Sequence, residues 1–219
     1  MNTLLYKEAL KYDKRTFFQY YLSLIRIKHP FIFSFYTYND YNSKIIKICL
    51  FFFSFALYIT VNALFFNDST MHKIYEDDGS YNFIYQIPQI LYSSIICSVV
   101  NMVITFFSLT EKKILQIKKE KSNIEKNLKN ISKYLVIKFS LFYLLSLISL
   151  FLFWYYLSCF CAVYRNTQIH LIKDTLISFG LTMIYPFILN LFPGIFRIIS
   201  LKKLNREYIY KLSKIMQFV

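Results

Sequence analysis

Polar side chains recur inside otherwise apolar stretches of this chain, and these side chains can donate and accept hydrogen bonds. Ser93, Ser94, Ser98 and Asn101 follow one another at roughly helical spacing, and Asn62 stands near the end of another apolar stretch. Within a membrane such groups most often bond neighbouring helices, at about 0.6 kcal/mol each. The alternative is that they line a pathway. We treat these five residues as candidate intramembrane polar contacts.

Titratable and nucleophilic residues form no catalytic or metal-binding motif in this sequence. His29, His72 and His170 are far apart, and the topology below places His29 on the opposite side of the membrane from the other two. The cysteines belong to apolar runs or their edges, which suits a small apolar role. The acids of residues 67–80 lack the spacing of a calcium-binding loop. We therefore expect no enzyme activity, no cofactor and no metal site.

Long uncharged runs set the fold class. A helix needs about 20 apolar residues to cross the hydrocarbon core of a bilayer. Lipid offers backbone amides no water, so each run must be a helix or a strand of a closed barrel. Strict alternation of polar and apolar residues is absent, which removes the barrel. We expect an all-α, polytopic membrane protein with four transmembrane helices, at about 45–67, 88–110, 137–164 and 175–197.

Basic residues are divided unevenly among the segments that connect these runs. Of the 26 Lys and Arg residues, 23 lie before the uncharged run 48–67, in the connection 111–138 or after the run 175–196. Short loops rich in Lys and Arg stay cytoplasmic. The N-terminal segment 1–44, the middle connection and the basic tail 201–219 are therefore expected in the cytoplasm. The connection 165–174, with Asp174 at its end, is expected on the other side.

The cytoplasmic location of most Lys and Arg residues accounts for the formal net charge of +14. It favours attraction to the anionic lipids of the inner leaflet, and no nucleic-acid-binding module is recognisable. The expected partners are the lipid bilayer, its anionic inner-leaflet lipids and other membrane subunits, but no nucleic acid. We expect an integral protein of the plasma or ciliary membrane.

Two helical segments are expected beside the spans. Residues 13–28, with Asp13 as the cap, form an amphipathic pattern that suits an interfacial helix along the cytoplasmic surface. Between spans two and three, hydrophobic residues alternate by three and four, as in a short coiled-coil seam. Two interpretations of this cytoplasmic helical connection stay open, namely an antiparallel hairpin that continues the two spans and an amphipathic helix that binds a partner.

Two features of the expected spans bear on mechanism. Pro186 cannot donate a hydrogen bond to the carbonyl of Thr182, so we expect a kink there. No ionisable residue falls at the centre of an expected span. Proton relays, voltage sensors and coupled transporters normally place such residues there, so this pattern counts against those classes.

Four short segments carry a resemblance to known membrane proteins. They read YDKRTFFQYY (12–21), VNALFF (61–66), MHKIYED (71–77) and FCAVYRNTQ (160–168). With them the chain resembles uncharacterised multispanning membrane proteins of ciliates and related protists over nearly its whole length. In that group the matching segment usually forms the C-terminal end of a larger protein that has a big extracellular region. The resemblance therefore implies a membrane anchor.

A weaker resemblance is to the membrane helices of the larger polycystins upstream of their channel region. Asn62-Ala63 at the end of one span, Ser93-Ser94 at the start of the next and DTLISF (174–179) carry it. Val99 stands where those proteins often have proline, and the channel helices are missing. The sequence thus favours a non-enzymatic membrane anchor or assembly module of a larger surface or ciliary membrane protein. The alternative is a subunit of a polycystin-like ion channel or transporter.

The division of basic residues predicts which segments face the cytoplasm. In a background without the native cysteines, Lys129→Cys should resist a membrane-impermeant thiol reagent on intact cells, whereas Asp77→Cys should react. Both positions should react after permeabilisation, which controls for accessibility. Reaction of position 129 from outside would contradict the topology.

Overall fold

The computed structural model describes residues 4–36, 40–111, 114–115, 124–202 and 206–217. Within these ranges all regular structure is helical. Four of the described helices are long and apolar enough to cross a membrane, namely Lys44–Phe65, Phe83–Ser108, Asn130–Val163 and Arg165–Lys202. The prediction of an all-α protein with four spans is confirmed.

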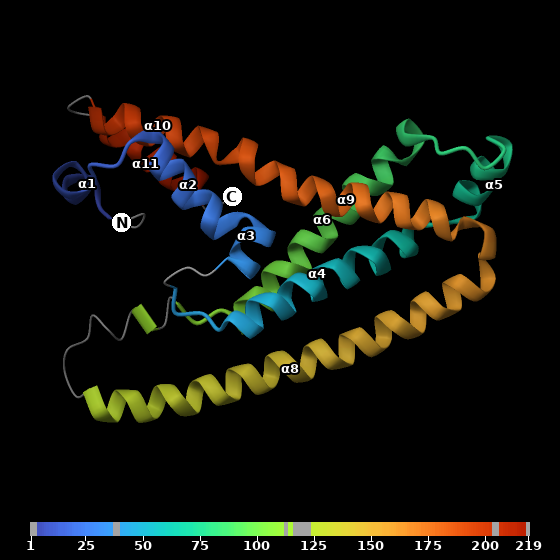
Figure 1. Ribbon diagram of the computed structural model, residues 1–219, viewed down its shortest axis with the longest axis horizontal. Helices are drawn as coiled ribbons and strands as arrows, with labels where there is room; N and C mark the ends of the chain where they lie inside the picture. The colour runs from blue at the N-terminus through green and yellow to red at the C-terminus, as the bar shows by residue number, and fades with distance from the viewer. Residues whose placement is uncertain (1–3, 37–39, 112–113, 116–123, 203–205, 218–219) are drawn as a thin grey trace. The chain divides into compact units, whose positions relative to one another are not determined.

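The chain folds as two compact units (Figure 1). We call Asn39–Leu181 the bundle unit, and Met1–Tyr38 together with Thr182–Val219 the terminal unit. Helix α9 (Gln168–Leu189) contributes residues to both. The end of the fourth span thus belongs with the N-terminal segment rather than with the other spans.

In the bundle unit, α4 (Lys44–Phe65) packs against both α6 (Phe83–Ser108) and α8 (Ile124–Val163). Ile46, Phe53, Ile104 and Phe142 form a buried apolar core between these helices. Within the most apolar 18 residues of each span, 44% of the residues in α4 are buried inside the protein, compared with 11% in α8. Helix α4 is therefore the inner element, and α8 has a wide apolar surface left for lipid or another protein.

Helix α8 is longer than a bilayer is thick. Its 40 residues span about 60 Å at about 1.5 Å per residue, twice the hydrocarbon thickness of about 30 Å. The predicted third span is therefore continuous with the second half of the middle connection. Residues 112–113 and 116–123, where the first half was expected, lie outside the described residues, so the two interpretations of this connection stay predictions.

Side chains from other segments form hydrogen bonds to the backbone just after the C-terminal end of α6. Asn42 Oδ1 accepts hydrogen bonds from the backbone amides of Thr110 and Glu111, at 2.9 and 3.1 Å. The Lys138 ammonium donates to the carbonyl of Leu109 at 2.7 Å. These contacts satisfy backbone groups that a helix end leaves without partners, and they join α6 to α8 and to the segment before α4.

Among its described residues, the terminal unit contains six helices or helix ends from the two extremes of the chain. They are α1 (Tyr6–Tyr12), α2 (Phe17–Lys28), α3 (Pro30–Phe35), the end of α9, α10 (Leu191–Lys202) and α11 (Glu207–Met216). Helix α2 packs on α10, and α11 packs on α10 and α1. The predicted basic tail thus includes a packed helix, while the interfacial position of α2 stays a prediction.

A buried arginine lies at the centre of the terminal unit. Arg197, 1% exposed, donates to Asp13 Oδ2 at 2.6 Å, and Arg15 donates to Asp13 Oδ1 at 2.7 Å. The rings of Tyr20 and Tyr210 lie 4.7 and 4.9 Å from the Arg197 guanidinium. Such stacking favours a buried cation. The first and last segments of the chain are thereby joined.

Asp13 has a different role from the predicted one. The cap of α2 is Thr16, whose hydroxyl accepts from the amide of Gln19 at 3.4 Å. Asp13 precedes the helix and serves the ion pair, because two guanidinium groups satisfy a buried carboxylate better than a helix end does. Burial acts to raise the pKa of Asp13, but the bonds from Arg15 and Arg197 outweigh it and lower that pKa to about 2.

The fourth span is interrupted at Asn190, between α9 and α10. The Asn190 amide side chain donates to the carbonyl of Pro186 at 2.7 Å. Pro186 itself lies inside α9. The kink predicted at Pro186 stays a prediction, and the break that the structure shows comes one turn later.

Asp13→Asn should lower the free energy of unfolding by about 3 kcal/mol, because it leaves the buried Arg197 without its counter-ion. Since the pKa of Asp13 is depressed, the wild-type pair should stabilise the fold fully above about pH 4 and lose this effect as the pH falls towards 2. Thermal unfolding in detergent across this pH range measures both effects.

The matched control is Glu207→Gln, which removes an exposed ion pair with Lys211. Exposed pairs of this kind contribute little, so this variant should unfold like the wild type. Equal stability of the Asp13 and Glu207 variants would contradict the assigned role of the buried pair.

Candidate functional site

A buried polar cluster lies in the bundle unit where α4, α6 and α9 meet. Its members are side chains that are buried within the spans, and we call them the polar cluster: Asn62, Gln89, Ser93, Asp174, Thr175 and Ser178. A buried carboxylate within a membrane span is expensive and marks a candidate functional site. Asp174, which is fully buried, is therefore the central residue.

Asp174 belongs to the fourth span because α9 starts earlier than predicted. Arg165–Thr167 forms a short 3-10 helix, and α9 begins at Gln168. Leu171, Asp174 and Ser178 are all buried, and their spacing of three and four residues places them on one helix face. Most of the connection expected at 165–174 is therefore helical, and Asp174 lies near the N-terminal end of the fourth span rather than at its centre.

Neutral donors hold the Asp174 carboxylate. Its Oδ1 accepts a short hydrogen bond from the Tyr81 hydroxyl, and its Oδ2 accepts from Gln89 Nε2 at 3.3 Å. Gln89 Nε2 also lies 3.4 Å from the backbone carbonyl of Asn62. In the part of the chain that the structure describes, no Lys or Arg forms an ion pair with Asp174. Burial and the adjacent carboxylate raise the pKa of Tyr81.

Asn62 joins α4 to the same face of α9. Its Nδ2 donates to Ser178 Oγ at 2.8 Å and lies 3.5 Å from Thr175 Oγ1. The other amide atom, Oδ1, is buried without a hydrogen-bond partner, as are Gln86 Oε1 and His170 Nδ1. Asn62 Oδ1 is therefore an acceptor that the polar cluster leaves available to a water molecule or another donor.

The other candidate contacts lie apart from Asp174. Asn101 donates to Ser54 Oγ at 2.8 Å, which joins α6 to α4. Ser94 and Ser98 donate to the carbonyls of Ile90 and Ser94 in their own helix, at 2.8 and 2.7 Å. Ser93 also bonds its own helix, through the Gln89 carbonyl at 2.8 Å. Of the five candidates, the structure therefore places Asn62 and Ser93 in the polar cluster.

Sequence reasoning missed Asp174, Gln89 and Tyr81 as site residues. The signal that was missed is the spacing of Leu171, Asp174 and Ser178 by three and four residues, which continues the helical period of the fourth span towards its N-terminal end. Among the described residues, no group of three or more His, Cys, Asp or Glu could hold a metal ion. The site is thus one carboxylate surrounded by amides and hydroxyls.

Tyr81→Phe should lower the free energy of unfolding by about 1.5–3 kcal/mol, because it removes a donor from a buried charged acceptor. Tyr75→Phe is the matched control, since Tyr75 is 82% exposed. Unfolding of both variants in mixed detergent micelles provides the comparison. Indistinguishable stabilities would show that the Tyr81–Asp174 contact contributes nothing.

Comparison with known proteins supplies no relative from which a role could be taken. No family model, curated protein sequence or solved structure matches this chain. The role of the polar cluster must therefore be argued from its own geometry, a buried carboxylate held by neutral donors.

Proposed function

We propose that this chain is a non-enzymatic integral membrane anchor or assembly module of a larger surface or ciliary membrane protein. One observation carries the proposal, namely that buried or half-buried polar side chains of the spans hydrogen-bond one another across helices. Asn62 bonds Ser178, Asn101 bonds Ser54 and Gln89 bonds Asp174. Contacts of this kind fix helices against each other, which is what an anchor requires.

The outer surfaces of the spans support an assembly role. Of the span in α6, 17% is buried, so most of its side chains face outward. Large apolar residues such as Met102, Phe106, Phe151 and Trp154 are exposed on α6 and α8. In a membrane, these faces contact lipid or the spans of another subunit.

Both termini are proposed to lie in the cytoplasm, at the plasma or ciliary membrane. The division of basic residues supports this orientation. The terminal unit supports it too, because α1 and α11, from the two ends of the chain, pack together and so belong on one side of the membrane.

A subunit of a polycystin-like channel or transporter is the second candidate, and the burial of Asp174 is the observation that favours it. Carboxylates in spans often mark ion or proton pathways. The proposed anchor accounts for Asp174 differently, as an acceptor that joins the start of α9 to α6 and to Tyr81.

Reconstitution into liposomes separates the two candidates. The purified full chain should carry no Na⁺, K⁺, Ca²⁺ or H⁺ flux above protein-free vesicles, because Asp174 and most of the polar side chains described in its spans are hydrogen-bonded within the protein. Asp174→Asn should alter stability alone, and Asp78→Asn, an exposed acid, should alter neither property. A selective flux that disappears in Asp174→Asn and persists in Asp78→Asn would refute the anchor proposal.

A further inference from the structure

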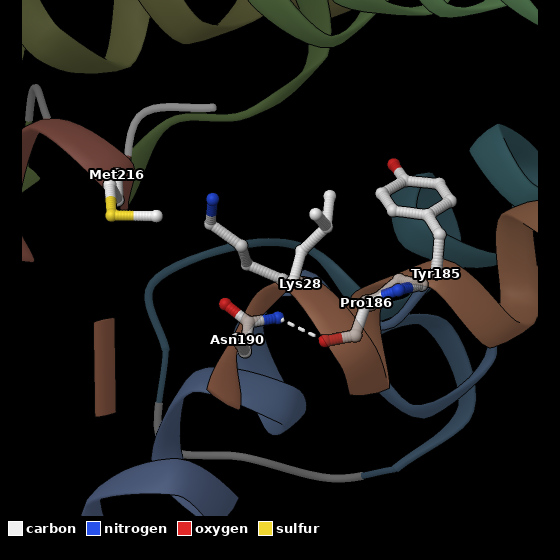
Figure 2. Close-up of a pocket in the computed structure, with 6 residues that line it drawn as sticks. Lys28, Tyr185, Pro186, Asn190 and Met216 are labelled. Carbon is white, nitrogen blue, oxygen red and sulfur yellow. Dashed lines mark hydrogen bonds between the residues drawn. The ribbon is translucent and has the colours of Figure 1, made fainter. Parts of the chain in front are cut away.

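A cavity of about 190 Å³ lies within the terminal unit, between α2 and the end of α9 (Figure 2). Its lining combines one basic side chain with amide, phenol and apolar groups: Lys28, Tyr185, Pro186, Leu189, Asn190 and Met216. In Figure 2 the Lys28 side chain extends towards Met216, and Asn190 turns its amide back to the Pro186 carbonyl. The Asn190 break thus shapes one wall.

Lys28 is held at this cavity by the residues around it. It is the last residue of α2, and His29 directly after it caps α3 by accepting from the Ile32 amide at 3.4 Å. The His29 ring packs on Phe187 at 4.8 Å. From two turns earlier in α2, the Tyr21 hydroxyl donates to the Phe187 carbonyl at 2.9 Å. The corner between α2 and α3 is therefore fastened to α9.

No acidic side chain in the described part of the chain compensates the charge of Lys28. None of the six lining residues is acidic, and the described residues include no ion pair to this ammonium. Burial lowers the pKa of Lys28. A half-buried ammonium without a counter-ion is a site for an anion.

The surroundings also favour an anion. In sequence the terminal unit holds twelve Lys and Arg residues against three acids. Each of these acids is engaged locally: Asp13 with Arg15 and Arg197, Glu207 with Lys211, and Glu8 with the Leu5 amide. The unit therefore carries a positive field that raises the local concentration of anions.

Size and lining narrow the class of anion. Pockets for drug-sized ligands have about 300–1,000 Å³, whereas this cavity has room for about six water molecules at about 30 Å³ each. It therefore suits a headgroup rather than a whole amphiphile. Pro186, Leu189 and Met216 provide an apolar wall, and the adjacent Ile188 and Phe192 are exposed, as acyl chains require.

We propose that this cavity binds the phosphate headgroup of an anionic phospholipid, with the Lys28 ammonium as its counter-ion and the acyl chains along the exposed face of the fourth span. Under the proposed topology this end of the span lies at the cytoplasmic leaflet, which carries the anionic lipids. The binding site itself does not depend on whether the chain is an anchor or a channel subunit.

Lipid titration of the full chain in neutral detergent, followed by native mass spectrometry, tests the proposal. Phosphatidylglycerol should bind the wild type about tenfold more tightly than phosphatidylcholine does, since one charge-assisted contact distinguishes them. Lys28→Gln should abolish this preference. Arg26→Gln should keep it, because it removes an equal charge from an exposed position on the same helix.

A second variant tests the cavity itself. Leu189→Trp keeps the Lys28 ammonium but fills the cavity, so this variant should also lose the preference for phosphatidylglycerol. It provides the test of the site if Lys28→Gln does not fold. Equal losses in Lys28→Gln and Arg26→Gln, or equal binding of the two lipids to the wild type, would overturn the site. Displacement of the lipid by millimolar inorganic phosphate would assign the cavity to a soluble phosphate compound and overturn the lipid as ligand.

Discussion

Hydrocarbon offers no hydrogen-bond partner, and this constraint explains how most polar groups in the described parts of the spans are arranged. Backbone amides are satisfied within helices, and serine hydroxyls return to the carbonyls of their own helix, as at Ser94 and Ser98. The remaining polar side chains must meet across helices. Asn62 with Ser178 and Asp174 with Tyr81 are the contacts that result. Helix packing in the bundle unit therefore depends on a few polar contacts in addition to apolar shape.

In the terminal unit, a buried polar group is satisfied by an ion pair and by aromatic rings. Arg197 is buried, but it is stacked between two tyrosines and bonded to Asp13. Lys28 differs from Arg197, because its cavity contains no acid. The contrast between a compensated and an uncompensated basic residue in one unit is the physical basis for assigning the first to folding and the second to binding.

Sequence reasoning predicted the spans well because hydrophobicity over about 20 residues is a strong local signal. It placed Asp174 outside the membrane because Lys173 and Asp174 look like the end of a loop. Its partners Tyr81 and Gln89 lie 93 and 85 residues away in sequence, and Asp13 is 184 residues from Arg197. Such pairings depend on tertiary structure. Nor does sequence show whether a serine such as Ser98 bonds its own helix or another one.

The central claim is that the buried carboxylate of Asp174 stabilises the bundle through its contact with Tyr81. A double-mutant cycle of Tyr81→Phe and Asp174→Asn, measured as free energies of unfolding in detergent, tests this claim most directly. The account predicts a coupling energy above about 1 kcal/mol, since the two groups are in contact. Additivity of the two substitutions within about 0.5 kcal/mol would contradict it, because independent sites behave in that way.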